Sequence, residues 1–215
     1  MTLDFLHHPP TKIVGIGSNY RRHIEEMGKS VPSVPKVFLM PTTALLGPGE
    51  AIRIPPGTQR VDHEAELGVV IGRRMSRVRA AHALDHVAGY TCVNDVTARD
   101  FQRLDGVFAR AKGFDTFCPV GPVLASDIDP SDLRVRAWVD GELRQDGRTS
   151  DMIFDVPALL EFVSHIMTLE PGDILTTGTP SGVGPLLAGQ SVTIEVEGIG
   201  RLVNPVVDRE DRESG

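Results

Sequence analysis

Two carboxylates, Glu64 and Glu66, stand one residue apart in the apolar stretch "VDHEAELGVV" at residues 61–70. Residues i and i+2 of a strand point to the same face, so both carboxylates converge while Ala65 and Leu67 face the core. Like charges held this close repel each other unless a cation neutralises them, and hard divalent ions prefer oxygen ligands. The pattern indicates either a metal site or a solvated strand face.

A third carboxylate decides between these two interpretations. Asp95 ends the apolar run in "CVNDVTARD", a position from which it can meet the first pair. Acids at the ends or faces of several core strands favour a metal site over a solvated face. We therefore expect Glu64, Glu66 and Asp95 to hold one Mg²⁺ or Mn²⁺ ion.

Three further segments carry groups that are able to act on a substrate. His23 and Glu26 share one side of a short helix in "NYRRHIEEM", forming either a general base held by a carboxylate or a surface pair. Lys112, in "ARAKGFDTFCPVG", either stabilises an oxyanion or is an exposed loop lysine. The segment "TTGTPSGVG" (176–184) offers N–H groups and hydroxyls to an anion, but lacks the G-K-[ST] of a nucleotide-binding P-loop.

Strands must position most of these side chains, because strand-like apolar runs dominate the chain. Asp140-Gly141 indicates a hairpin turn, and "EGIG" at 197–200 indicates a second one. We predict strands over residues 12–17, 36–40, 51–55, 64–72, 89–95, 134–140, 173–179, 191–198 and 202–207.

Helices are fewer and shorter. The clearest is "DVPALLEFVSHIM" (155–167), with Asp155 as N-cap and Pro157 in the first turn. One stripe of that helix is apolar and is expected to pack on a sheet: Val156, Leu159, Leu160, Val163, Ile166 and Met167. Shorter helices are predicted at 19–28, 78–87 and 97–104. Since strands and helices do not alternate, we expect a mainly β, α+β fold around a mixed, curled sheet.

The composition favours a globular protein that acts on small molecules. The chain has 215 residues, 40% of them hydrophobic and 24% charged, which suits one domain over 1–215 with an N-terminal extension (1–11) and a frayed tail (208–215). Its net charge of -7 and lack of a basic cluster argue against nucleic-acid and membrane partners. No apolar run approaches the ~18 residues of a membrane span, so we expect a cytoplasmic protein, with Cys92 and Cys118 as reduced core thiols.

A series of motifs, in this order and over residues 12–207, resembles the fumarylacetoacetate hydrolase superfamily. The similarity is to its single-domain branch of acylpyruvate hydrolases and 2-hydroxyhepta-2,4-diene-1,7-dioate isomerases. The motifs are "GSNYRRHIEEMG", "VDHEAELGVVIGR", "GYTCVNDVTARDFQ", "RAKGFDTFCPVGP", "GELRQDG", "MIFDVPALLEFVS" and "LEPGDILTTGTPSGVGP".

The resemblance implies a mixed β-roll catalytic domain that forms homodimers and binds a divalent metal at the glutamates and the aspartate already named. It places the family's catalytic residues on His23, Glu26 and Lys112, with the first two on a segment that often orders as a lid. Substrate contacts fall on Gln102 and Thr179. We also expect Arg99 and Gly178, in the same two motifs, to contact the substrate.

The implied function is hydrolysis of a carbon–carbon bond in an acylpyruvate through a metal-stabilised pyruvate enolate. The same site would also serve a decarboxylase or a keto–enol isomerase of 2-oxo acids, and a catalytically silent metal or small-acid binding protein is the alternative of another class. The dyad of His23 and Glu26 favours hydrolysis, because a base that activates water is not needed when CO₂ simply leaves.

Two departures from the family pattern concern charge. Met40, in "FLMP", stands where many relatives have lysine, and Ser18 stands where several have arginine. Both replacements remove positive charge, which predicts weak binding of substrates with a distal carboxylate.

Overall fold

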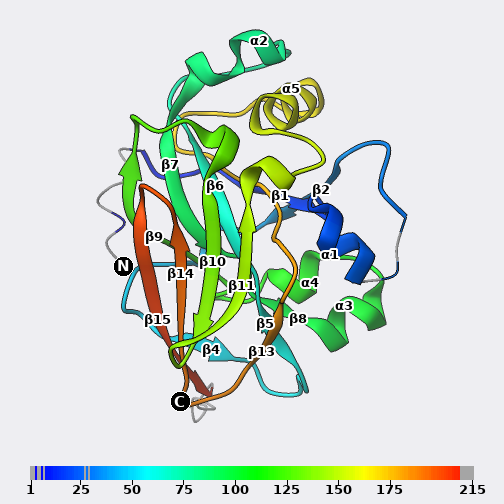
Figure 1. Cartoon of the computed structure of the whole chain (residues 1–215), viewed down its shortest axis with the longest axis vertical. Helices are drawn as coiled ribbons and strands as arrows, with labels where there is room; N and C mark the ends of the chain where they lie inside the picture. The colour runs from blue at the N-terminus through cyan, green and yellow to red at the C-terminus, as the bar shows by residue number, and fades with distance from the viewer. Residues whose placement is uncertain (1–2, 4–5, 7, 27, 29, 209–215) are drawn as a thin grey trace, which may run out of the picture.

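A seven-stranded mixed sheet forms the centre of the computed structural model, which describes residues 3, 6, 8–26, 28 and 30–208 (Figure 1). Its strands lie in the order β2 (Lys36–Met40), β1 (Ile13–Gly17), β12 (Ile174–Thr176), β6 (Ala65–Ile71), β7 (Val87–Asn94), β9 (Cys118–Ala125) and β3 (Leu45–Leu46). The pairs β1–β12 and β3–β9 are parallel, and the other neighbours are antiparallel. Every residue of β6 is buried, as is typical of a strand covered on both faces.

A five-stranded sheet covers one face of the central sheet (Figure 1). Its strands lie in the order β11 (Glu142–Arg148), β10 (Arg134–Val139), β14 (Ser191–Val196), β15 (Gly200–Asp208) and β4 (Ile52–Ile54). The main core fills the space between the sheets, where Leu67 and Val69 of β6 pack with Ile194 of β14. The predicted turn between β10 and β11 is confirmed, with φ of 50° at Asp140 and 81° at Gly141.

A small three-stranded sheet, β13 (Gly184–Leu186), β5 (Val61–His63) and β8 (Thr97–Ala98), lies beside the central sheet. Three short helices lie to its right in Figure 1: α1 (Arg21–Glu26), α3 (Arg99–Asp105) and α4 (Ala109–Lys112). Single 3-10 turns occupy η1 (Thr42–Ala44), η2 (Leu84–His86), η3 (Pro130–Asp132) and η4 (Thr149–Asp151).

The longest described helix, α5 (Val156–Ile166), begins as the sequence predicts. The Asp155 side chain accepts a hydrogen bond from the Ala158 N–H at 2.9 Å and caps the helix. The apolar stripe is buried except at its end, where Ile166 is 56% exposed. Ile166 is the last helical residue and lies at the edge of the stripe, so its predicted burial is wrong. Helix α2 (Ala80–Ala83) packs against α5.

The mainly β, α+β architecture is confirmed, and several element boundaries are corrected. The strand predicted at 64–72 starts at Ala65, the strand predicted at 173–179 ends at Thr176, and only 80–83 of the helix predicted at 78–87 is α-helical. Of the predicted frayed tail, Asp208 is instead paired with Ile54, and 209–215 lie outside the described residues, as do five of the residues in 1–11.

Cys92 and Cys118 are buried free thiols, as expected. Within the described ranges, no helix is long and apolar enough to cross a membrane.

Candidate active site

The three predicted metal ligands meet in one buried cluster. Glu64 links β5 to β6, Glu66 is the second residue of β6, and Asp95 directly follows β7. One carboxylate oxygen from each lies within 4.8 Å of the others. None of the three residues is more than 5% exposed, so the solvated-face interpretation is wrong.

Pairing between β6 and β7 brings these acids together. The two strands are antiparallel, with Ala65 opposite Asn94 at the end nearest the cluster. The Glu64 N–H donates to the Asn94 side chain at 3.0 Å, and the Asp95 N–H donates to the Glu64 carbonyl at 2.9 Å. These bonds hold the two chain segments together beyond the regular ladder. Because Ala65 and Leu67 pack into the main core, the intervening carboxylates are directed to the opposite side.

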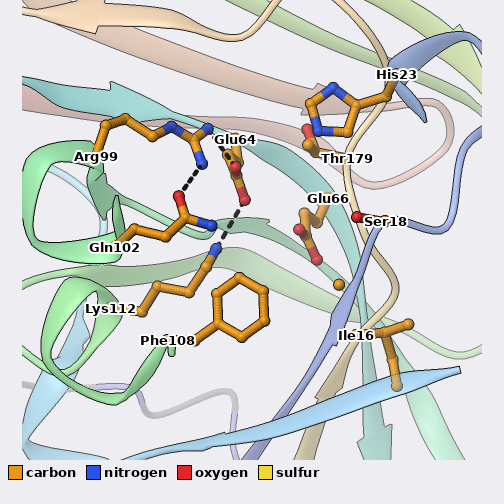
Figure 2. Close-up of a pocket in the computed structure, with 11 residues that line it drawn as sticks. Ile16, Ser18, His23, Glu64, Glu66, Arg99, Gln102, Phe108, Lys112 and Thr179 are labelled. Atoms are coloured by element: carbon orange, nitrogen blue, oxygen red, sulfur yellow. Dashed lines mark hydrogen bonds and ion pairs between the residues drawn. The ribbon is translucent and has the colours of Figure 1, made fainter. Parts of the chain in front are cut away.

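Lys112 lies inside the cluster rather than in an exposed loop. It ends helix α4, and its side chain is 4% exposed. Its ammonium donates to Glu64 at 2.8 Å (Figure 2) and also to Asp95. The exposed-loop interpretation of this lysine is therefore wrong. Arg99, at the start of α3, donates to Glu64 from a second direction and to Asp62 at 2.9 Å. Two cations thus compensate the buried Glu64 carboxylate.

The carboxylates differ in electrostatic surroundings. Burial raises the pKa of Glu66 well above its ordinary value, and the charges of Asp95 and Glu64 raise it further. Burial opposes ionisation of Glu64 as well, but Lys112 and Arg99 outweigh it and lower its pKa. Glu66 receives one hydrogen bond, from the Gly178 N–H at 2.8 Å. Glu66 is consequently the member of the cluster with the least charge compensation.

The donor set suits a hard divalent cation. Oxygen atoms from three carboxylates face one another, and Asp95 Oδ1 is buried without a hydrogen-bond partner among the described residues. Oxygen ligands of this kind bind Mg²⁺ and Mn²⁺, and an added cation would relieve the repulsion that raises the Glu66 pKa. Glu64, Glu66 and Asp95 are the residues that would hold it.

His23 and Glu26 come from helix α1. Figure 2 shows His23 on the side of the pocket opposite Lys112. His23 is 5% exposed, and its Nδ1 lies 3.5 Å from Glu26 Oε2, too far for a well-formed hydrogen bond. Burial lowers the pKa of His23, although Glu64 and Glu26 oppose that effect. A neutral imidazole at this position is able to accept a proton. The pair is adjacent, as predicted, but Glu26 is half-exposed and accepts instead from the Gly182 N–H at 3.3 Å.

The predicted substrate contacts divide into two groups. Gln102, Arg99 and Thr179 line a pocket of about 30 Å³ together with His23, Glu64, Glu66 and Lys112. Gln102 accepts from Arg99 at 3.0 Å, which leaves its NH₂ group for a ligand. Gly178 has a φ of 90° and donates its N–H to Glu66, so it positions a predicted metal ligand. The contacts of all four with substrate stay predictions.

No sequence pattern predicted a role for Gln145, although this residue connects the parts of the site. It is fully buried on β11 and donates to the Thr179 hydroxyl at 2.7 Å and to the Pro180 carbonyl at 2.8 Å. Its own oxygen accepts from the Ala65 N–H at 2.9 Å and lies 3.0 Å from His63 Nδ1. One amide therefore joins the start of β6 to the loop that carries Thr179.

Asp62 and Asn19 support the site in a similar way. Asp62 accepts from Arg60 and Arg99 and so fixes the arginine that contacts Glu64. Asn19 donates to the Thr177 carbonyl at 2.8 Å and exchanges hydrogen bonds with the backbone of Phe154, which anchors the loop after β12. Local sequence signals do not identify Asn19, because its partners lie more than 130 residues away along the chain. Asp62 joins the neighbouring Arg60 to Arg99, which is 37 residues away.

Of the two departures from the family pattern, Ser18 and Met40, only the first lies at the pocket. Met40 is 3% exposed and packs in a second core cluster with Ile13 and Val70, so it does not lie in the pocket wall. The register of β2 explains this difference, because Met40 pairs with the buried Ile13. The weak binding of substrates with a distal carboxylate stays a prediction.

The family model for the fumarylacetoacetate (FAA) hydrolase C-terminal domain matches residues 12–207. The chain belongs to the fumarylacetoacetate hydrolase family. Its similarity to a Mycobacterium tuberculosis protein, Rv2993c, is 52% identity over 200 residues, covering 92% of this chain and 76% of the relative.

Solved structures of the family include enzymes named as isomerases and as hydrolases. The 5-carboxymethyl-2-hydroxymuconate delta-isomerase from Mycobacterium smegmatis is 50% identical with a TM-score of 0.89, covering 94% of this chain and 80% of that one. The 2-hydroxyhepta-2,4-diene-1,7-dioate isomerase from Mycobacterium marinum is 49% identical with a TM-score of 0.88, covering 94% and 76%. The fumarylacetoacetate hydrolase from Exiguobacterium antarcticum is 41% identical with a TM-score of 0.85, also covering 94% and 76%.

Proposed function

We propose that this protein is a divalent-metal-dependent hydrolase that cleaves a carbon–carbon bond in acylpyruvate-type 2,4-dioxo acids. The observation that carries the proposal is the buried cluster of Glu64, Glu66 and Asp95 beside His23 and Lys112. Membership of a family with a named fumarylacetoacetate hydrolase supports it. The homodimer and the cytoplasmic location expected from the sequence are part of the same proposal.

Glu64, Glu66 and Asp95 would hold a divalent cation, which, when bound, would supply a Lewis acid for the negative charge that develops on the substrate. His23, neutral because its pKa is lowered, accepts a proton from a water molecule that attacks the distal acyl carbonyl. Glu26 stabilises the imidazolium that forms. When the bond between the acyl carbon and pyruvyl C3 breaks, C3 takes the electron pair and the proton that the His23 imidazolium releases, and His23 becomes neutral again. The products are the carboxylic acid and pyruvate.

Lys112 has donors for a second role in this reaction. An ammonium group carries three N–H donors, of which one contacts Glu64 and one contacts Asp95. The remaining donor is available to the oxyanion that forms at the attacked carbonyl. Gln102 offers a second donor in the pocket that Lys112 lines. Its oxygen accepts a hydrogen bond from Arg99, so its NH₂ group is the part that is available to the substrate.

Keto–enol isomerisation is the second candidate, favoured by the isomerase names of two relatives that are 49% and 50% identical. In that reaction His23 would transfer a proton between positions of the substrate without activating water. Decarboxylation of a 2-oxo acid uses the same carboxylate cluster and needs no water activation either.

Product analysis separates these reactions. The purified protein is incubated with Mg²⁺ or Mn²⁺ and acetylpyruvate, oxaloacetate or 2-hydroxyhepta-2,4-diene-1,7-dioate, with an EDTA control. Loss of enol absorbance, pyruvate and CO₂ are followed. We expect metal-dependent formation of pyruvate and acetate from acetylpyruvate. Isomerisation or CO₂ release without acetylpyruvate cleavage would refute the hydrolase assignment, and no turnover of any substrate would favour a binding protein.

A further inference from the structure

A second cavity lies between the loop that follows β9 and the start of β7. It has a volume of about 410 Å³, within the range of cavities that hold small molecules. A smaller cavity of about 100 Å³ continues it to the start of α5, since Leu84, Asp129 and Pro130 line both. We call the two together the Asp129 groove. Its defining residues are Leu84, Tyr90, Asp127, Asp129, Pro130 and Asp155.

The Asp129 groove is separate from the candidate active site. No described residue lines both the groove and the small pocket. Tyr90 lies within β7 and Asp95 directly follows that strand, so the two are roughly 17 Å apart at about 3.4 Å per strand residue. The groove adjoins the turn after α2 and the start of α5, and these two helices lie together at the top of Figure 1.

The groove is acidic and contains no compensating cation. Asp127, Asp129 and Asp155 line it, whereas no lysine, arginine or histidine does among the described residues. All three carboxylates are exposed, and none forms an ion pair within the described part of the chain. Other exposed acids pair with arginine, as these do: Asp105, Asp132, Glu142 and Asp146. The groove therefore attracts positively charged ligands.

The hydroxyl of Tyr90 is a second feature that indicates a ligand. Tyr90 is 4% exposed, its ring packs in the main core, and no described residue forms a hydrogen bond with its hydroxyl. Burial and the nearby charge of Asp129 raise the pKa of Tyr90 to about 12, so the hydroxyl end lies near Asp129 and stays protonated. Because buried hydroxyls normally have a hydrogen-bond partner, this one has room for a partner from the groove.

The rest of the groove wall is apolar. Leu84 lies at the junction of the two cavities and is 41% exposed, beside Pro130. Val87 and Ile128 line the larger cavity, and Val156 lines the smaller one. An apolar surface between separated carboxylates suits a ligand with methylene groups between its charges. The three acids are also not among the described acids that gather closely enough to hold a metal ion.

We propose that the Asp129 groove binds a linear aliphatic diamine, with one ammonium group at Asp127, Asp129 and Tyr90 and the other at Asp155. A primary ammonium has three N–H donors, and two carboxylates and one phenol oxygen are three acceptors for them. The methylene chain packs on Leu84 and Pro130 between the two ends. This site is independent of the proposed hydrolysis.

A series of three ligands of equal chain length tests the proposal. Binding of 1,5-diaminopentane, pentylamine and 1,5-pentanediol to the full, metal-free chain is measured by calorimetry at neutral pH and low salt. We expect the diamine to bind at least about fivefold more tightly than pentylamine, and the diol not to bind. Added salt should weaken binding of the diamine, because the carboxylates are exposed.

Variants assign each end of the diamine. Asp129→Asn should weaken binding of the diamine and of pentylamine about fivefold each. Tyr90→Phe keeps the ring in the core and should weaken both about threefold. Asp155→Asn should lower the affinity for the diamine to that for pentylamine and leave pentylamine unchanged. Asparagine caps a helix as well as aspartate does, so α5 stays folded in this variant.

The matched control is Asp85→Asn. Asp85 is 70% exposed and follows Leu84 directly, but it does not line the groove. This control should change both affinities by less than about twofold. Equal affinities of wild type for the diamine and pentylamine, or no detectable binding of either, overturn the proposal. An equal loss in Asp85→Asn and Asp129→Asn, or unchanged binding of the diamine to Asp155→Asn, overturns it as well.

Discussion

Glu64 and Glu66 are both buried carboxylates, yet the protein compensates only one of them fully. Glu64 contacts the side chains of Lys112 and Arg99, whereas Glu66 accepts one backbone hydrogen bond from Gly178. A buried charge without a partner destabilises the fold. When one member of a buried ion pair is removed, the remaining member becomes such an uncompensated charge. The two glutamates should therefore respond in opposite ways to neutralisation.

Glu64→Gln should lower the free energy of unfolding by about 3 kcal/mol in EDTA, because Lys112 and Arg99 lose the charge that they surround. Glu66→Gln should raise it by about 1 kcal/mol under the same conditions, because the amide keeps the bond from Gly178 and removes an unfavourable charge. Denaturant titration of both variants measures the difference. Equal destabilisation by the two substitutions would contradict this description of the cluster.

The lowered pKa of His23 determines the pH dependence that we expect for hydrolysis. Burial lowers its pKa from the ordinary 6.5, and the base must be neutral to accept a proton. The acidic limb of kcat/KM should therefore have its midpoint below 6.5, with activity retained at neutral pH and lost as the pH falls through that midpoint. A midpoint above 6.5 for this limb would contradict the assignment.

His23→Ala separates water activation from the other reactions. The loss of a general base should reduce acetylpyruvate hydrolysis about 10²-fold or more, but oxaloacetate decarboxylation much less. His82→Ala is the control, because that side chain is 71% exposed on α2. Equal losses in hydrolysis and decarboxylation would argue that His23 has another role.

The sequence predicted the acidic residues of the site because their signal is local. The i,i+2 spacing of Glu64 and Glu66 and the position of Asp95 after an apolar strand are visible in short windows. Lys112 and Gln145 carry no such signal. Their burial depends on partners 17 to 82 residues away in the chain, including Asp95 and His63.

At the scale of elements, the amide of Gln145 links the start of strand β6 to the loop after β12 through hydrogen bonds. Gln145→Met removes four hydrogen-bonding contacts and leaves buried polar groups without partners, so it should cost about 2–4 kcal/mol of stability. It should also lower kcat more than it changes KM, because Thr179 is displaced. The exposed Gln59→Met is the matched control, with an expected change within about 0.5 kcal/mol. Wild-type stability and kcat in Gln145→Met would contradict the role of this residue.

Elements with clear apolar periodicity could be predicted from the sequence. Elements that are too short to show a period, or whose residue types disfavour the structure they adopt, could not. Strand β9 has the sequence "CPVGPVLA", and its prolines and glycine disfavour a strand inside a sheet, yet it lies between β7 and β3. Helix α4 has four residues, too few for a helical period to be recognised. Tertiary packing determines both, and α4 is the element that brings Lys112 into the site.

At the scale of the whole molecule, the acidic cluster joins the central sheet to the three-stranded sheet. Glu64 is the residue between β5 of the small sheet and β6 of the large one. A cation bound there should stabilise the native state by about 2.7 kcal/mol at 100 times its dissociation constant. Thermal denaturation with added Mg²⁺ measures this shift. We expect it in wild type and not in Glu66→Gln, and an equal shift in both would place Mg²⁺ elsewhere.

The mixed, mainly β class could be predicted for the whole chain, but the order of its strands could not. Strand β12 inserts between β1 and β6, which are more than 100 residues earlier in the sequence. No local pattern encodes such a pairing. A cavity of about 630 Å³ beside the site has the same origin, since β2, the turn before β5 and α3 all contribute residues to its lining.

The release of pyruvate from acetylpyruvate as a function of Mg²⁺ tests the central claim most directly. Protein stripped with EDTA and dialysed is titrated with Mg²⁺, and folded Glu66→Gln is titrated in parallel. We predict that stripped wild type is inactive, that Mg²⁺ restores activity saturably, and that Glu66→Gln releases no pyruvate at the same Mg²⁺ concentrations. Pyruvate release by wild type that persists in EDTA, or equal release by Glu66→Gln and wild type, would contradict the account.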